Sequence, residues 1–245
     1  HCKTRRQRQM CIRDSLLSFP VVGSIQRLHA IPRVSVRSIM IKRYGIIGCG
    51  MMGQEHLRNI NLINDAIAYA IYEPNINMQK MAKKLAPDAK FYDSLDKILS
   101  DENIDCWLIV SPNHLHMDQL EQLAGIPHRP ILVEKPLFTE IKHLERIKNF
   151  SIKYSAPVWV AMEYRYMPPI AELIKRQNNV TGGTKMLSIR EHRFPFLPKV
   201  DDWNRFNKNS GGTFVEKCCH FFDLMRLITG SNPTKIMASG GQAVN

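Results

Sequence analysis

Short apolar segments alternate with helical segments over residues 40–164, and no other feature restricts the fold of this chain as strongly. The apolar segments are residues 44–48, 66–73, 105–112, 130–136 and 157–164. Between them, apolar residues recur with helical spacing over residues 51–63, 78–85, 116–123 and 144–154. Apolar strands separated by helices of about 10 to 15 residues are typical of a parallel sheet that helices cover on both faces. The sequence therefore predicts an α/β fold, with a doubly wound parallel sheet over residues 40–162.

A second domain begins after Tyr164, where the pattern changes. Two prolines open a helical segment at residues 167–177, and residues 185–196 alternate between apolar and polar as a strand does. Residues 210–230 are typical of one apolar helix, and residues 235–245 resemble a further strand. We expect residues 163–245 to form an incomplete second α/β domain.

Residues 1–39 have a composition of their own, because eight basic residues accompany a single acid, a net charge of +7. An Arg- and Ser-rich segment almost free of acids fits an organellar transit peptide. Alternatively, QMCIRDS at residues 9–15 resembles translated adapter sequence, and Met40 stands where a native start would fall. In both cases we expect residues 1–39 to be a disordered leader outside the fold.

Composition argues against several classes of protein. The net charge of +12 falls to +5 without residues 1–39, and no basic stripe interleaved with aromatic residues follows, so nucleic-acid binding is not expected. No run of about 18 uncharged apolar residues indicates a membrane span. The six cysteines lack CxxC spacing, so no metal site is predicted, and reduced thiols in the cytoplasm are the simplest interpretation. A genuine transit peptide would instead indicate an organelle.

Three glycines, Gly48, Gly50 and Gly53, follow the first apolar segment. Their GxGxxG spacing is informative here because it follows a predicted strand and opens a predicted helix. The first glycine permits a tight turn, the second lets the backbone approach a pyrophosphate, and the third lets helix and strand pack closely. The helix then offers free N–H groups to the phosphates. The predicted dinucleotide-binding residues of this turn are Gly48, Cys49, Gly50, Met51, Met52 and Gly53.

Glu73 ends the next apolar segment, about 20 residues after the glycine turn. A carboxylate there accepts hydrogen bonds from ribose hydroxyls and repels a 2′-phosphate. Pro74 and Asn75 follow, with no adjacent Arg, which favours NAD over NADP. The alternative is a solvated acid at the end of a strand.

Three ionisable residues, Glu216, His220 and Asp223, lie within the apolar segment 210–230. Spacings of four and three residues place them on one face of a continuous helix. Burying an unpaired ionisable group costs on the order of several kcal/mol, so these groups must pair or line a wet cavity. A core histidine with carboxylate partners and a catalytic pocket both satisfy that requirement.

Two further motifs, SPNHLH at residues 111–116 and VEKP at residues 133–136, follow the glycine turn in order. With the glycine-rich entry, acid and histidine of segment 210–230, they resemble the Gfo/Idh/MocA family of oxidoreductases from Met40 to the end of the chain. The resemblance implies a Rossmann domain and a C-terminal α/β domain whose open, largely antiparallel sheet covers the nicotinamide. It also implies hydride transfer at a hydroxyl or carbonyl carbon of a sugar, inositol or related polyol. Family members are longer, so a C-terminally truncated chain is expected.

The resemblance assigns residues beyond the glycine turn. Lys135 matches the family's reactive lysine and also a cofactor contact, with Glu134 beside the cofactor. A lysine that ends a buried strand is desolvated, which lowers its pKa. Ser111, Asn113 and His116 would lie near the nicotinamide ribose, although the residues of SPNH equally form a turn and a helix cap.

The resemblance also makes His220 the general base and Glu216 the acid that orients its ring, while Asp223 anchors the helix. The predicted catalytic residues are Lys135, His220 and Glu216, and the predicted substrate-binding residues are Lys135, Arg165, Trp203 and His220. The family's acid is commonly Asp, so Glu216 departs from the pattern and leaves the substrate open.

Three functions remain open on the sequence alone. The leading one is an NAD-dependent dehydrogenase of a small-molecule sugar or polyol. The alternatives are a glycosidase that uses bound NAD transiently, as some relatives do, and a non-catalytic dinucleotide-binding protein. A homo-oligomer stays open for the full-length protein.

Overall fold

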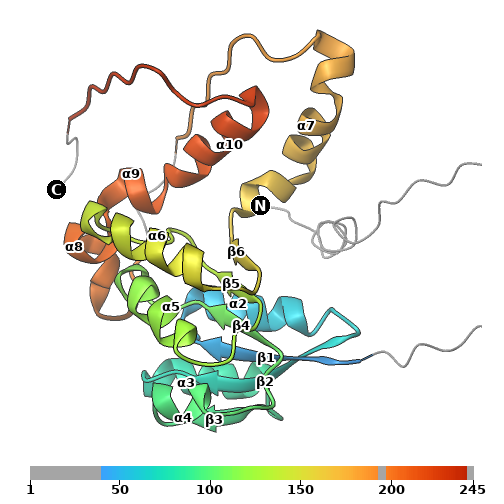
Figure 1. Ribbon diagram of the computed structural model, residues 1–245, viewed down its shortest axis with the longest axis vertical. Helices are drawn as coiled ribbons and strands as arrows, with labels where there is room; N and C mark the ends of the chain where they lie inside the picture. The colour runs from blue at the N-terminus through green and yellow to red at the C-terminus, as the bar shows by residue number, and fades with distance from the viewer. Residues whose placement is uncertain (1–39, 193–196, 242–245) are drawn as a thin grey trace, which may run out of the picture.

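The computed structural model describes residues 40–192 and 197–241, so the leader predicted at residues 1–39 lies outside the described residues. The described residues form a six-stranded sheet in the order β3-β2-β1-β4-β5-β6 (Figure 1). Every neighbouring pair of strands in this sheet is parallel. This order is that of a doubly wound Rossmann sheet, which confirms the fold predicted for the first part of the chain.

The sheet and its helices follow one another as the sequence predicts. The strands are β1 (Lys42–Ile47), β2 (Ala66–Tyr72), β3 (Lys90–Tyr92), β4 (Cys106–Ile109), β5 (Ile131–Val133) and β6 (Val158–Val160). The helices among them are α2 (Met51–Ile60), α3 (Ile76–Leu85), α4 (Leu95–Leu99), α5 (His116–Ala124) and α6 (Leu144–Lys153). Strand β3 and helix α4 were not expected, because three and five residues are too short to show a period.

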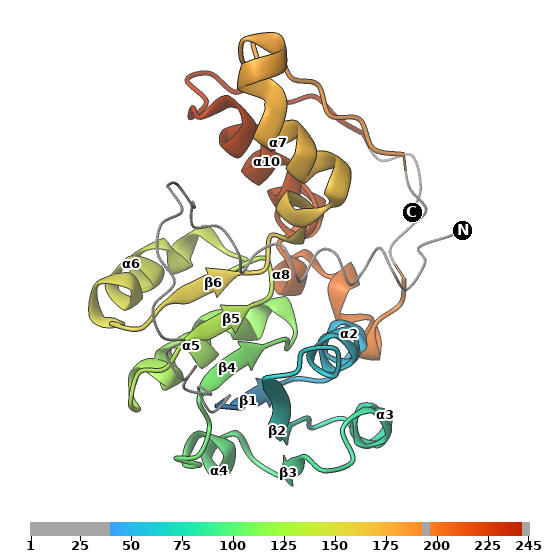
Figure 2. The same cartoon turned by 90° about the vertical axis from the view of Figure 1, so that its right-hand side faces the viewer.

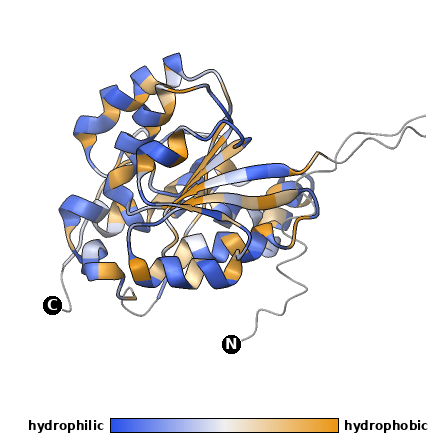
Figure 3. Cartoon of the chain, turned by 90° about the horizontal axis from the view of Figure 1, so that it is seen from below, coloured by the Kyte–Doolittle hydropathy of each residue, from blue (hydrophilic) through white to orange (hydrophobic). Residues whose placement is uncertain are grey.

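The two faces of the sheet carry separate apolar cores. Ile46 packs in the core that includes Leu57 of α2, whereas the next residue, Ile47, packs in the core that includes Leu120 of α5. Successive side chains of a strand point to opposite faces, so a strand buried on both faces must be apolar throughout. Figure 3 shows this arrangement as hydrophobic strands between helices with one hydrophilic side.

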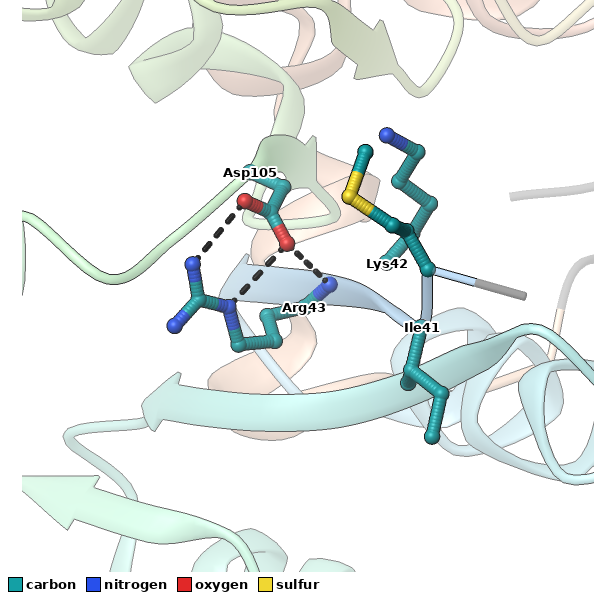
Figure 4. A pocket seen from close by; sticks show the side chains of 5 residues that line it. Ile41, Lys42, Arg43 and Asp105 are labelled. Atoms are coloured by element: carbon teal, nitrogen blue, oxygen red, sulfur yellow. Dashed lines mark hydrogen bonds and ion pairs between the residues drawn. The ribbon is translucent and has the colours of Figure 1, made fainter. Parts of the chain in front are cut away.

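A polar clamp joins the amino ends of β1 and β4. The Asp105 carboxylate accepts from the Arg43 backbone N–H at 2.9 Å and from Nε and Nη2 of the same residue at 3.1 Å each (Figure 4). A shallow hollow beside this clamp is lined by residues 40–43 and Asp105. It lies at the amino ends of the strands, opposite the edge where open α/β sheets bind ligands.

The chain after β6 folds into helices that lie beside one end of the sheet (Figure 2). Their bounds are η3 (Glu163–Tyr166), α7 (Pro168–Thr181), η4 (Val200–Arg205), α8 (Asn207–Ser210), α9 (Gly212–Glu216) and α10 (Cys219–Thr229). Gln177 of α7 donates from Nε2 to the Ile228 carbonyl of α10 at 3.1 Å, which ties these two helices together. Within the residues described, no helix is both long and apolar enough to cross a bilayer.

The strand predicted at residues 185–196 is wrong over residues 185–192, and residues 193–196 lie outside the described residues. Leu187 and Ile189 are half-buried while Met186 and Ser188 are exposed, so the alternation is real. No described segment lies alongside to complete a ladder, and a strand exists only where its backbone groups pair with another. Of the further strand predicted at residues 235–245, residues 235–241 form none, for the same reason, and residues 242–245 lie outside the described residues.

The helix predicted over residues 210–230 is divided into α8, α9 and α10. Gly211 has a φ of 79°, a left-handed conformation that ends α8, and Lys217 with Cys218 separates α9 from α10. Because of this break, Glu216 and His220 do not lie on successive turns of one helix. The one-face argument made from their spacing is therefore wrong.

Candidate active site

A cleft of about 1050 Å³ lies at the carboxyl ends of the central strands. Its walls come from the segments that follow β1, β2, β4 and β5, and from residues 198–203 of the second part of the chain. Ligands of open α/β sheets bind outside the carboxyl ends of the strands, at the point where strand order reverses. This cleft is therefore the candidate site, and the hollow beside Arg43 is not.

The glycine turn has the shape that a dinucleotide requires. Gly48 has a φ of 93°, and a Cβ there would lie 2.7 Å from the Ser111 backbone nitrogen. Gly50 lines the cleft, and a Cβ there would meet no protein atom within 4 Å. Among the described residues, no side chain caps the amino terminus of α2, which leaves N–H groups for a ligand. The residues present thus fit a pyrophosphate at this turn.

The other predicted residues of the turn divide into two groups. Met51 and Met52 line the cleft together with Gly48 and Gly50. Cys49 does not line the cleft, because its side chain is buried in the core. This burial also raises the pKa of the Cys49 thiol. Gly53 also lies off the cleft, because its Cα packs so closely that an added Cβ would lie 2.7 Å from the Gly48 carbonyl oxygen. These two residues shape the turn and do not present side chains to a ligand.

Glu73 lines the cleft at the end of β2, and its carboxylate is held by the backbone. Oε2 accepts from the Cys49 N–H at 2.5 Å, and Oε1 accepts from the Asn75 N–H at 2.8 Å. Each carboxylate oxygen has a second acceptor position. The side chain is therefore fixed by the protein and can still accept from the hydroxyls of a ribose.

The segment after β4 contributes Ser111 and Asn113 to the cleft. Asn113 Nδ2 is buried and has no partner among the described residues, so a donor is left for a ligand. His116 differs from its prediction, because its ring is 0% exposed and cannot contact a cofactor. Its Nδ1 and Nε2 lie 2.8 and 3.0 Å from the carbonyl oxygens of Pro136 and Ser111, so His116 joins the segments after β4 and β5.

The segment after β5 brings Glu134 and Lys135 to the cleft wall. Glu134 Oε1 lies 2.8 Å from Nε2 of His56 on α2. Burial pushes the pKa of Glu134 upward, but the bond to His56 and the nearby Lys135 outweigh it and lower the pKa overall. Glu134 therefore favours its ionised form.

Lys135 joins the two parts of the chain. Its ammonium donates to the Glu216 carbonyl oxygen at 2.9 Å, across 81 residues of sequence. Lys135 also lowers the pKa of His220, after the larger effect of burial. The predicted catalytic residues Lys135, Glu216 and His220 are thus neighbours, although only Lys135 lines the cleft.

His220 lies behind the cleft wall and is 2% exposed. Tyr164 stacks on its ring with centroids 4.3 Å apart, and Glu163 Oε1 lies 3.5 Å from Nε2. Glu163 is therefore an acid in contact with the ring, and the sequence did not assign that contact to it. Burial, with Lys135 and then Lys217, lowers the pKa of His220 to about 4, so the ring is neutral at pH 7.

Arg165 and Asp223 pair with each other. Arg165 Nε donates to Asp223 Oδ2 at 2.6 Å, and Nη2 donates to Oδ1. This fork binds η3 to α10 and agrees with the anchoring role expected of Asp223. Arg165 does not line the cleft, in contrast to the substrate contact suggested for it.

We predict that this pair stabilises the fold and does not bind substrate. Asp223→Asn should lower the free energy of unfolding by about 1–2 kcal/mol, or roughly 2–8 °C in melting temperature, because it breaks a bidentate pair that is partly shielded from water. Arg165→Met should cost a similar amount, and the double variant should cost less than the sum. Thermal unfolding measures all three.

The exposed pair between Asp93 and Lys97 provides the control, because Asp93→Asn should leave the melting temperature unchanged. An Arg165→Met protein of unchanged stability with a tenfold higher KM would contradict this assignment and restore Arg165 to the substrate site.

Three residues of the site were missed by sequence reasoning or named only within a longer loop. His56 contacts Glu134, and both His114 and Lys199 line the cleft. Trp203, which was predicted, lines the cleft and meets the His114 ring edge-on at a centroid distance of 6.2 Å. A polar residue one turn after the glycines could have indicated His56, but no local signal identifies Lys199.

Both parts of this chain match known protein families. Residues 42–162 match the oxidoreductase family Gfo/Idh/MocA with its NAD-binding Rossmann fold, and residues 175–245 match the C-terminal alpha/beta domain of that family. Myo-inositol 2-dehydrogenase of Thermotoga maritima is 27% identical over 204 residues, which are 83% of this chain and 59% of that protein.

Solved structures share the fold at lower identity. Myo-inositol dehydrogenase from Lactobacillus casei, in complex with NAD(H) and myo-inositol, superposes with a TM-score of 0.63 at 20% identity, over 78% of this chain and 55% of that one. The WlbA dehydrogenase from Thermus thermophilus, in complex with NAD and alpha-ketoglutarate, gives 0.61 at 22% identity, over 77% and 62%.

The chain thus spans about 59% of the length of the Thermotoga relative. Both parts of the chain nevertheless match successive domains of one family, and the glycine turn and Lys135 occupy one cleft as their motifs predict. This chain belongs to the Gfo/Idh/MocA family of oxidoreductases.

Proposed function

We propose that this chain is part of an NAD-dependent oxidoreductase that transfers a hydride at a hydroxyl or carbonyl carbon of a sugar, inositol or related polyol. One observation carries the proposal: Lys135 lines the same cleft as the glycine turn and donates to the Glu216 carbonyl at 2.9 Å. The glycine turn and the Glu-Lys-Pro segment thereby meet the helices of the second part at one place.

The names of the relatives support the substrate class. The Thermotoga relative is a myo-inositol 2-dehydrogenase, and the Lactobacillus structure holds myo-inositol with NAD(H). At 27% and 20% identity, these names support a polyhydroxylated small molecule and do not select one.

In this proposal, the residues in and near the cleft have different roles in the oxidation of the substrate. When bound, NAD supplies a hydride acceptor at C4 of its nicotinamide. Lys135 donates a hydrogen bond from the cleft wall to the substrate oxygen, and His220 takes the hydroxyl proton. Glu163 beside the ring stabilises the charge that His220 then acquires. Because His220 is 2% exposed and does not line the cleft, it reaches the substrate only when the side chains that cover it move.

We predict that the protein binds NADH at least about tenfold more tightly than NADPH. The reason is the Glu73 carboxylate, which two backbone N–H groups hold at the cleft wall and which would repel a 2′-phosphate. Glu73→Gln should reduce that preference, because it removes the charge. Fluorescence titration of both cofactors measures it.

Glu102→Gln serves as the control for this variant, since Glu102 is exposed and does not line the cleft. Tighter binding of NADPH by the unaltered protein would contradict the role given to Glu73.

The function is tested by incubating the full-length protein with NAD and a panel of sugars, inositols and their acids while recording NADH absorbance. Net NADH formation with at least one member supports the proposal. A protein that binds NADH, forms none, and releases the aglycone of a glycoside would instead be the NAD-using glycosidase. Absence of NADH binding would contradict both.

A further inference from the structure

Lys199 lies on the cleft wall contributed by the second part of the chain, facing the same space as Lys135. We propose that the substrate carries an anionic group, a carboxylate or a phosphate, and that Lys199 binds it. The inference rests on the proposed function, because it concerns the substrate of that same site.

The Lys199 ammonium is held in place without an ion pair. It lies 5.0 Å from the centroid of the Trp203 ring, a cation–π contact, and Trp203 packs in turn on His114. Within residues 40–192 and 197–241, no carboxylate forms an ion pair with Lys199. The half-buried side chain is therefore positioned by an aromatic ring and keeps its donors available.

The acids around this ammonium have other partners. Glu134 is bonded to His56. Glu216 raises the pKa of Lys199, but Glu216 is engaged in a contact of its own. Lys135 adds a second positive charge to the same cleft.

Burial is the largest influence on Lys199 and lowers its pKa. The attraction of Glu216 and Glu134 does not fully offset burial and the repulsion of Lys135. A positive charge that is desolvated without full compensation attracts an anion that enters the cleft. The cleft lining also includes Glu73, Asp118, Glu134 and Asp201, so the match to an acidic group is local to Lys199 and Lys135.

The phosphates of the cofactor are a second source of negative charge. Lys199 interacts electrostatically with Glu134, Lys135 and Glu216, which lie at the end of β5 and at α9. The glycine turn, where a pyrophosphate fits, follows β1 instead. Lys199 is therefore placed with the residues proposed for chemistry, which favours the substrate over the cofactor.

The test measures binding to the full-length protein saturated with NADH, by calorimetric titration. D-glucuronate, D-glucose 6-phosphate and D-glucose are the probes, because they differ at one carbon. At least one anionic sugar should bind tenfold or more tightly than glucose, a difference of about 1.4 kcal/mol. Lys199→Met should reduce this advantage to less than about threefold, and Lys199→Arg should retain it.

Lys208→Met is the matched control, because Lys208 is exposed and lies over the Phe206 ring at 5.9 Å. It should retain the advantage in full. Equal binding of all three sugars, or of none, overturns the inference, as does an anionic advantage that persists in Lys199→Met.

The same titrations separate the inference from the proposed function. If Lys199→Met weakens NADH binding as much as it weakens binding of the anionic sugar, Lys199 belongs to the cofactor site. The inference then fails, and the proposed function stands. If the unaltered protein binds no NADH, the proposed function fails and the inference fails with it.

Discussion

Gly50→Ala is expected to abolish most NADH binding while leaving the protein folded. A Cβ at this position meets no protein atom within 4 Å, and the backbone φ of −63° suits alanine. The added methyl group instead occupies the space in which a pyrophosphate approaches the backbone. We expect the dissociation constant for NADH to rise by about 100-fold, or roughly 2.7 kcal/mol, with a melting temperature within about 2 °C of the unaltered protein.

Gly48→Ala should behave in the opposite way and damage the fold itself. Its φ of 93° is unfavourable for alanine, and the new Cβ would lie 2.7 Å from the Ser111 nitrogen and 2.8 Å from the Val110 carbonyl carbon. These backbone atoms directly follow the central strand β4 and cannot move aside easily. We expect a loss of about 3 kcal/mol in the free energy of unfolding, or roughly 6–12 °C in melting temperature.

The two variants form a matched pair, because each adds one methyl group to the same turn. Calorimetric NADH titration of both proteins measures whether the added methyl group occupies the space of the ligand. Thermal unfolding measures whether it strains the backbone. Gly50→Ala protein that binds NADH normally would show that this turn does not hold the pyrophosphate. Equal melting temperatures for the two variants would contradict the strain assigned to Gly48.

The Rossmann part of the fold could be predicted because its information is local. Ile46 and Ile47 pack into opposite cores, and this two-sided burial is visible in the sequence as an apolar run. The glycine turn was equally predictable, because its spacing follows from the bend and the close approach of backbone to ligand. Short elements such as β3 were not predicted, since three residues define no period.

The second part could not be predicted as well, because its structure depends on distant partners. Residues 185–192 alternate as a strand does, but a strand needs a neighbour and the described residues supply none. The spacing of Glu216 and His220 assumed a continuous helix, and the break at Lys217 removed that relation. Spacing within a segment is informative only when the segment keeps one conformation.

In the candidate site, too, local motifs could be predicted from the sequence and contacts between distant residues could not. Residues carried by motifs reached the cleft, as Ser111, Asn113 and Lys135 did. Contacts between motifs were not foreseeable, because 58 residues separate Arg165 from Asp223 and 81 separate Lys135 from Glu216. His116 lies in a motif and is still buried, which shows that a motif residue can serve the turn and not the ligand.

His220→Ala is expected to lower kcat by a factor on the order of 10² to 10⁴ while NADH binding stays nearly intact. The ring is neutral at pH 7, because burial and two neighbouring lysines lower its pKa to about 4, so it is free to accept a proton. It does not line the cleft, so its loss should not disturb the cofactor. Steady-state kinetics with a substrate found by the NADH assay, together with NADH titration, measure both effects.

A second variant distinguishes the loss of proton transfer from the loss of side-chain packing. His220→Ala also leaves a cavity against Tyr164, which costs about 1–3 kcal/mol of stability, whereas His220→Gln fills most of that space and cannot take the proton at pH 7. The loss of kcat should therefore be similar in both variants, and the loss of stability should be confined to His220→Ala. His128→Ala is the control, because His128 contacts Tyr154 and Ser155 away from the cleft and should leave kcat unchanged. Turnover that survives in His220→Gln would remove His220 from the mechanism and leave Lys135 as the residue that handles the proton.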